Sequence, residues 1–139
     1  MHYGFDGKVA LVTGAGSGIG RASALGFASS GARVVVSDIN ETGGEETVAM
    51  IVAAGGTAVF QKCDVSNGQD VKALVARAVS EFGGLDYAHN NAGINSMMAN
   101  EYDDDVWAQS VGVNLTGVMM CMREEAEVML KAGMGAIVN

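Results

Sequence analysis

Short, uninterrupted apolar runs alternate along the chain with longer stretches in which apolar residues recur every three or four positions. Apolar runs are typical of strands buried in a parallel sheet, and the three-to-four repeat is typical of helices that cover one. Strands are predicted at residues 9–12, 33–37, 57–62, 85–89 and 135–139, and helices at 21–30, 41–54, 66–82 and 103–132. This alternation predicts an α/β fold, a doubly wound parallel sheet of about five strands with helices on both faces.

The helical repeat also predicts which side chains face the sheet. In the helix at 41–54 these are Val48, Ile51 and Val52, and in the helix at 66–82 they are Val71, Leu74, Val75, Ala78 and Val79. The stretch at 103–132 repeats Trp107, Val111, Asn114, Leu115, Val118, Met122, Ala126 and Met129. We interpret this last face as core packing, with a substrate-facing surface as the alternative.

The first predicted strand runs directly into a glycine-rich turn with the spacing G-x-x-x-G-x-G. Glycines let the backbone turn tightly and approach a ligand without a Cβ in the way. A helix that starts at this turn would direct its unpaired first N–H groups toward a pyrophosphate. The sequence therefore predicts a phosphate-binding turn, with an ordinary strand-to-helix turn as the alternative. Its residues are Gly14, Ser17, Gly18, Ile19 and Gly20.

An acidic residue, Asp38, stands at the end of the second predicted strand, 18 residues after Gly20. This is close to the ~20 residues that separate a glycine turn from the acid that binds an adenosine ribose. A turn or helix-capping role is the alternative. A carboxylate about 4 Å from the extra phosphate of NADP would repel it by about 4 kcal/mol at an effective dielectric near 20. Neither Ser17 nor Ile39 supplies a basic side chain, so NAD is the predicted cofactor.

Polar residues also follow the third and fourth predicted strands, at the edge where open α/β sheets bind ligands. Asp64 could face an adenine or cap the next helix, and the sequence leaves both open. The segment Asn90-Asn91-Ala92-Gly93 could bridge neighbouring strand ends, because an Asn amide both donates and accepts hydrogen bonds, or it could be a plain loop.

Composition limits the kind of protein. The chain has 139 residues, 49% hydrophobic and 17% charged, so residues 1–139 are expected to form one globular domain. A net charge of −8 with only 8 Lys and Arg argues against nucleic acid and membrane surfaces as partners. No apolar run approaches the ~18 residues of a membrane span and the N-terminus lacks a signal-peptide pattern, so a cytoplasmic protein is expected. Cys63 and Cys121 are expected as reduced core thiols, and no metal site is expected.

Five segments together resemble the N-terminal, cofactor-binding portion of the classical short-chain dehydrogenase/reductase family, in the family's order and across nearly the whole chain. They are residues 13–20, Asp38, Asp64-Val65, Asn90 to Gly93 and Val113 to Gly117. The resemblance implies a Rossmann fold with NAD on the glycine turn and Asp38, and adenine near Asp64 and Val65. It places the nicotinamide ribose near Asn91, Ala92 and Gly93.

The same resemblance implies that Asn114 is the helical member of a catalytic tetrad and holds a water in a proton relay. A polar residue that packs in a helix is the alternative. The family's chemistry also needs a Ser, and a Tyr followed four residues later by a Lys, and none of the tyrosines here has such a lysine. In the family the Ser comes shortly after the fifth strand, which 135–139 resembles.

We therefore expect an NAD-dependent oxidoreductase for an alcohol or carbonyl substrate, of which this chain is a truncated portion that lacks the C-terminal part of the full fold and is inactive alone. A homo-oligomer is expected, because the helix at 103–132 often pairs with its symmetry mate in the resembling family. The alternative is a non-catalytic dinucleotide-binding or oligomerising module. A methyltransferase with a similar glycine loop is disfavoured by the Asn-Asn-Ala-Gly segment.

Overall fold

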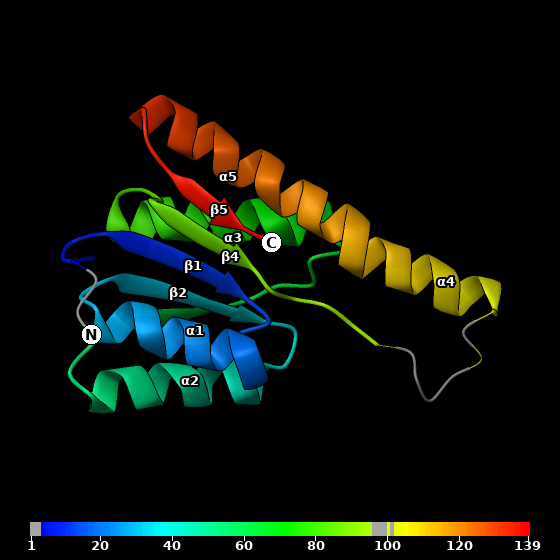
Figure 1. The fold of residues 1–139 in the computed structure, drawn as a ribbon, viewed down its shortest axis with the longest axis horizontal. Helices are drawn as coiled ribbons and strands as arrows, with labels where there is room; N and C mark the ends of the chain where they lie inside the picture. Colours follow the sequence, from blue (N-terminus) through cyan, green and yellow to red (C-terminus); the bar gives the residue numbers. More distant parts are fainter. Residues whose placement is uncertain (1–3, 96–99, 101) are drawn as a thin grey trace.

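Five parallel strands form one sheet in the order β3-β2-β1-β4-β5 (Figure 1). The computed structural model describes residues 4–95, 100 and 102–139. The strands are β1 (Val9–Thr13), β2 (Arg33–Asp38), β3 (Thr57–Lys62), β4 (Tyr87–Asn90) and β5 (Ala136–Val138). The order confirms the predicted Rossmann-type, doubly wound α/β sheet. The chain winds outward in one direction from β1 to β3 and in the other from β4 to β5, so a crevice is expected where β1 meets β4.

Helices cover both faces of this sheet, α1 and α2 on one side and α3 and α5 on the other (Figure 1). Their bounds are α1 (Gly18–Ser29), α2 (Glu41–Ala53), α3 (Gly68–Phe82), α4 (Asp104–Val111) and α5 (Val118–Ala132), with a π-helical segment η1 (Gly112–Gly117) joining the last two. These elements lie close to the predicted ones.

The central strands are apolar along most of their length because both of their faces are covered. Every residue of β1 is buried, and successive side chains point to opposite faces. Leu11 and Val35 join the cluster under α3 and α5, while Val12 and Val34 join the one under α1 and α2. Full burial of such a side chain contributes about 1.5–3 kcal/mol, so these two clusters hold the sheet between its helices.

In each of two helices, one residue that was predicted to face the sheet is exposed instead. Val52 on α2 is 57% exposed and Val79 on α3 is 42% exposed, although both were predicted to face the sheet. Each is the immediate neighbour of a fully buried residue, Ile51 or Ala78. Adjacent helical residues lie about 100° apart around the axis, so the neighbour of a buried residue is turned toward solvent.

The predicted helix at 103–132 is interrupted by η1, and its interpretation as core packing is wrong along much of its length. Trp107 and Leu115 are each 67% exposed, and α4 has no buried residue. Figure 1 shows the reason: α4 extends beyond the sheet, so no strand lies beneath it. In α5 the predicted Met129 is buried against α3 and the sheet, together with Cys121, whereas the predicted Met122 is 39% exposed.

Candidate functional site

Residues that follow β1, β2, β3 and β4 line a cavity of about 590 Å³ at the carboxyl edge of the sheet. This volume lies within the range of roughly 300–1,000 Å³ that is typical of small-molecule sites. Most of the predicted site residues line it: Gly14, Ser17, Gly18, Ile19, Asp38, Asp64, Val65, Asn91, Ala92 and Gly93. Gly20 and Asn114 are not among the described lining residues. The parallel sheet thus gathers residues from widely separated parts of the chain into one site.

The glycine turn requires glycine for two different reasons. Gly14 and Gly18 have left-handed backbones, with φ of +62° and +53°. Gly20 is needed for close packing, because a Cβ there would collide with the carbonyl oxygen of Gly14. Gly20 therefore lets the first turn of α1 lie against the end of β1, although it does not itself line the cavity.

Asp38 holds the glycine turn through its carboxylate. One oxygen accepts a hydrogen bond from the Gly16 N–H at 2.8 Å, and the other accepts from the Asn40 N–H at 2.8 Å. The capping alternative is wrong, because α2 is capped by Asn40, whose side chain accepts from the Gly43 N–H. The alternative of a turn residue is partly correct, because the Asp38 carboxylate binds the N–H of Asn40, two residues further along the chain. Asp38 thus lines the cavity directly beside the turn.

Asp64 lies at the cavity end of the segment that follows β3. Its carboxylate accepts hydrogen bonds from the N–H of Ser66 at 2.9 Å and from the hydroxyl of Ser66 at 2.6 Å. The cap of α3 is Asn67, so the helix-capping alternative for Asp64 is wrong. The neighbouring Val65 is 6% exposed and joins the core under α3 and α5 while also lining the cavity.

The Asn-Asn-Ala-Gly segment bridges the ends of β4 and β1, as predicted. The Asn91 amide donates to the carbonyl oxygens of Thr13 at 3.1 Å and of Gly14 at 3.2 Å. The Ala92 N–H donates to the Thr13 hydroxyl at 3.0 Å. The alternative of a plain loop is therefore wrong, and these bonds fix the floor of the crevice at the point where the sheet changes direction.

Asn114 lies in η1 and binds the backbone that follows β4. Its side-chain oxygen accepts from the Ile94 N–H at 2.8 Å, and its amide donates to the Ile94 oxygen at 2.9 Å. Its side chain reaches across to a loop rather than packing within the helix, and a Cβ on Gly93 would lie 3.3 Å from its oxygen. Single π turns inside helices are frequent at functional sites, and this one carries the residue that joins the helix to the cavity rim.

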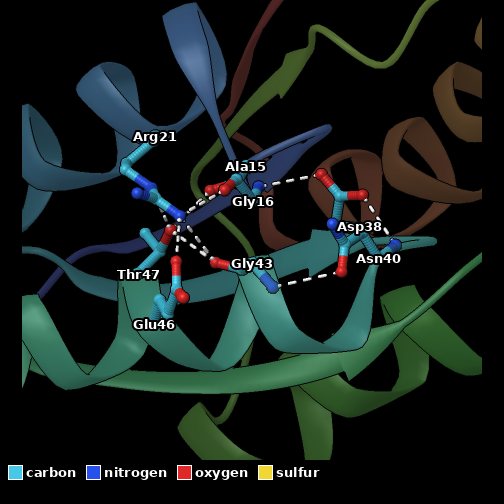
Figure 2. A network of polar contacts seen from close by, with 8 residues as sticks. All are labelled: Ala15, Gly16, Arg21, Asp38, Asn40, Gly43, Glu46 and Thr47. Atoms are coloured by element: carbon cyan, nitrogen blue, oxygen red, sulfur yellow. Dashed lines mark hydrogen bonds and ion pairs between the residues drawn. The ribbon is translucent and has the colours of Figure 1, made fainter.

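A second set of residues, behind the turn, was not predicted from the sequence. Arg21 on α1 and Thr47 on α2 bind backbone oxygens of the turn, and Glu46 forms an ion pair with Arg21 at 3.0 Å (Figure 2). A sequence signal was present in the pair Gly43-Gly44 inside a helix, since glycine is unfavourable there unless another segment packs closely. A Cβ on Gly43 would lie 2.8 Å from the Gly16 oxygen.

Carboxylates dominate the charge of the cavity. Asp38 and Asp64 line it, and none of its lining residues in the described part of the chain is Lys or Arg. The nearest cation behind the turn, Arg21, is paired with Glu46. The site therefore suits a ligand whose phosphates are bound by backbone N–H groups rather than by basic side chains.

A chain of polar side chains on the other side of the crevice joins β4 and α5 to the residue that follows β5. The Asn90 amide donates to the Glu125 carboxyl at 3.0 Å and to the Asn139 side-chain oxygen at 3.0 Å. Glu125 is completely buried. Burial raises the pKa of its carboxyl to about 7, and the hydrogen bond from Asn90 acts in the opposite direction. The helical repeat at 103–132 did not predict that Glu125 would be buried.

Cys63 and Cys121 are free and buried in one cluster, which confirms them as core thiols. Burial raises the pKa of each thiol to about 12, and neighbouring Asp70 and Glu125, respectively, raise it further, so neither is a nucleophile near neutral pH. In the described ranges no three His, Cys, Asp or Glu side chains are grouped closely enough to hold a metal ion. Nor does any helix there have the length and apolar character needed to cross a membrane.

A protein-family comparison matches residues 8–139 to the family described as short chain dehydrogenase. A 3beta-hydroxysteroid dehydrogenase from Mediterraneibacter gnavus is 50% identical over 137 residues, which are 97% of this chain and 49% of the relative. A cyclohexanol dehydrogenase from an Acinetobacter species is 47% identical over 137 residues, or 97% of this chain and 55% of the relative. The chain spans about half the length of the curated relatives it matches.

Solved structures give the same relationship. A short chain dehydrogenase/reductase from Burkholderia phymatum in complex with NAD superposes with a TM-score of 0.92 at 40% sequence identity. The superposition covers 99% of this chain and 50% of that one. A likeness this close in both sequence and backbone extends over every strand and helix described above.

Proposed function

The chain belongs to the short-chain dehydrogenase/reductase family, and from that premise we propose that residues 1–139 form the NAD-binding domain of an oxidoreductase. The full protein would transfer hydride between NAD and an alcohol or carbonyl carbon. The observation that carries the proposal is the cavity in which Asp38 lies beside a glycine turn. The family uses nicotinamide dinucleotides, and one homologous structure contains NAD.

The cofactor would occupy the length of the cavity. Its pyrophosphate would bind the N–H groups of Ser17, Gly18 and Ile19, where the dipole of α1 favours negative charge. Asp38 would accept hydrogen bonds from the adenosine ribose, because each carboxylate oxygen keeps a lone pair beyond its backbone bond. Adenine would lie near Asp64 and Val65. The supporting observation is that these groups surround one continuous space.

The nicotinamide end would lie near Asn91, Ala92 and Gly93, on the β4 side of the crevice. Asn114 would then hold a water for proton transfer close to the reacting carbon. Its support is indirect: the reciprocal bonds to Ile94 fix its side chain on the rim next to Gly93. The bound cofactor would supply the hydride chemistry, and this chain would supply binding and orientation.

The preference for NAD over NADP rests on charge. Asp38 would face the extra phosphate, and the described lining offers no Lys or Arg to neutralise it. Calorimetric titration of this chain should give an affinity for NAD at least about tenfold higher than for NADP, since close like charges repel by several kcal/mol in such a site. An equal or tighter NADP constant would contradict the assignment. Asp38→Ala should reduce the difference, whereas Asp105→Ala, an exposed acid on α4, should leave it unchanged.

The substrate of the full protein is proposed to be a cyclic alcohol or the corresponding ketone. The support is that two relatives are named for a hydroxysteroid and for cyclohexanol. This chain alone is expected to be inactive, because its sequence has no Tyr-x-x-x-Lys pair. Oxidation of cyclohexanol by the full protein with NAD, measured by absorbance of the reduced cofactor, tests the activity. Turnover by residues 1–139 alone would contradict the second part.

Self-association is proposed through the long helix. Exposed apolar side chains lie along α4, η1 and α5: Trp107, Leu115, Met119 and Met122. Such a row is costly in water and is a common mark of a protein interface. Sedimentation at tens of micromolar should give a species larger than a monomer, and a monomer would count against this part of the proposal.

A further inference from the structure

We propose that Thr47 and Arg21 are positioning residues that lock two successive peptide groups of the glycine turn, and so aim the Ser17 N–H at the cofactor's pyrophosphate. The inference rests on the proposed function of the cavity as a NAD site. It adds two residues that neither line the cavity nor belong to the glycine motif. Figure 2 shows Arg21 and Asp38 on opposite sides of Ala15 and Gly16.

The peptide between Ala15 and Gly16 is held at both of its polar groups. The Thr47 hydroxyl donates to the Ala15 oxygen at 2.8 Å, with the Gly43 oxygen at 3.0 Å as a second acceptor. The N–H of Gly16 donates to the Asp38 carboxylate at 2.8 Å. Because a peptide group is planar and rigid, it cannot rotate without breaking both bonds.

The next peptide, between Gly16 and Ser17, is held at its oxygen, which accepts from an Nη2–H of Arg21. Every peptide in the described chain is trans, so its C=O and N–H point in opposite directions. A carbonyl that faces Arg21 therefore turns the Ser17 N–H away from Arg21. Ser17 lines the cavity and Arg21 does not, so this N–H is presented on the ligand side.

Thr47 and Arg21 are themselves fixed by one another and by α2. The Nε–H of Arg21 donates to the Thr47 oxygen at 2.9 Å, and its Nη2 group lies 3.1 Å from the Gly43 oxygen and 3.0 Å from the Glu46 carboxylate. Thr47 is completely buried. Glycine at positions 16 and 43 allows this contact, since a Cβ on Gly16 would lie 2.8 Å from the Asp38 carboxylate.

One consequence is that the same carboxylate, that of Asp38, serves both the ribose end and the pyrophosphate end of the proposed site. The Asp38 carboxylate proposed to bind the ribose is also the group that holds Gly16. Thr47 contacts only the turn end of this arrangement. Removing its hydroxyl should therefore weaken binding of ligands with a pyrophosphate and leave adenosine unaffected, which separates the two ends.

The test compares Thr47→Val, which keeps the shape but cannot donate, with Thr47→Ser, which keeps the hydroxyl. Calorimetric affinity for NAD should fall about tenfold in Thr47→Val, the size of one hydrogen bond, and adenosine affinity should change less than about twofold. Thr47→Ser should restore NAD binding. Thr57→Val, the same substitution at an exposed position of β3, is the matched control and should bind as the wild type does.

A second measurement needs no ligand and separates positioning from general stability. Amide hydrogen exchange at Gly16 should quicken at least tenfold in Thr47→Val relative to exchange at Val35, a buried residue at the centre of the sheet. Equal acceleration at both amides, or none at Gly16, overturns the proposal. If the wild type binds no NAD, the proposed function fails, and exchange at Gly16 still decides whether Thr47 holds the turn.

Discussion

α2 and α4 are both short helices of one chain, and they differ in what they give to the fold. α2 buries Gly43, Gly44, Thr47 and Ile51 against the glycine turn and the sheet. α4 buries none of its residues, and its Trp107 is 67% exposed. α2, which packs behind the glycine turn, is thus held by polar and packing contacts within the chain, whereas α4 presents apolar surface. Substitutions should therefore damage the first region and leave the fold nearly unchanged in the second.

The largest effect is expected where the first region is packed most closely. In Gly20→Ala the new Cβ would collide with the Gly14 oxygen, and overpacking of this kind costs about 1–3 kcal/mol or more. Urea unfolding should show this loss. The matched control is Gly26→Ala, in the same helix with no atom within 4 Å of the new Cβ, which should stabilise the protein by about 0.5–1 kcal/mol. Equal stability of the two variants would contradict the packing role of Gly20.

The next effect concerns the pH dependence of stability at Glu125, a buried residue of α5. Because burial raises the pKa of Glu125 from 4.5 to about 7, the folded protein binds this proton more tightly than the unfolded chain does. The stabilisation is complete below the unfolded pKa and is lost as the pH rises through the folded one. Glu125→Gln lacks this titration, so its stability relative to the wild type should rise by roughly 2 kcal/mol between pH 5.5 and pH 8.

The control for this experiment is on the same helix. Glu127→Gln removes an exposed carboxyl whose pKa is lowered by the hydrogen bond and charge of Lys131, so it should change little between pH 5.5 and pH 8. Urea unfolding at these two pH values measures both variants. Cys121, beside Glu125, has its pKa raised to about 12 and does not titrate in this range. A difference between Glu125→Gln and wild type that is independent of pH would contradict the assignment.

The smallest effect on folding is expected on the exposed face of the long helix. Leu115→Lys should change the free energy of unfolding by less than about 0.5 kcal/mol, because Leu115 is 67% exposed. The same variant should weaken self-association at least tenfold in sedimentation, since it places a charge in the proposed interface. Val52→Lys, at an exposed apolar residue of α2, should leave sedimentation unchanged. If both variants behave alike, the interface lies elsewhere.

The sequence predicts well those features whose signals are local. The strands at the centre of the sheet are continuous apolar runs, and the glycine turn is marked by its own spacing, so β1, Gly14 and Gly18 could be recognised without the structure. Asp38 could be placed at the cavity edge because it ends a strand whose neighbours are fixed by the fold. In each case the residues whose pattern allows the prediction are the same residues that form the strand, the turn or the cavity edge.

Other features depend on which elements a helix packs against in the folded chain. The contact of Thr47 with the turn arises because α2 packs beside α1, and the residue pattern within either helix does not predict it. The exposure of Trp107 follows from the reach of α4 beyond the sheet, although its spacing matches that of buried residues. Val52 and Val79 show the same difficulty on a smaller scale, since one position around a helix separates core from solvent.

The π turn at Gly112–Gly117 sets how α4 is rotated about the axis of the long helix. A π turn holds one residue more than an α turn, so α4 is rotated by about 100° relative to the position a regular helix would give it. Loss of one residue from this turn would restore a regular helix and re-aim the indole of Trp107 around the axis. A change of one residue in this turn would therefore redirect α4 without altering the strands, all of which lie outside the turn.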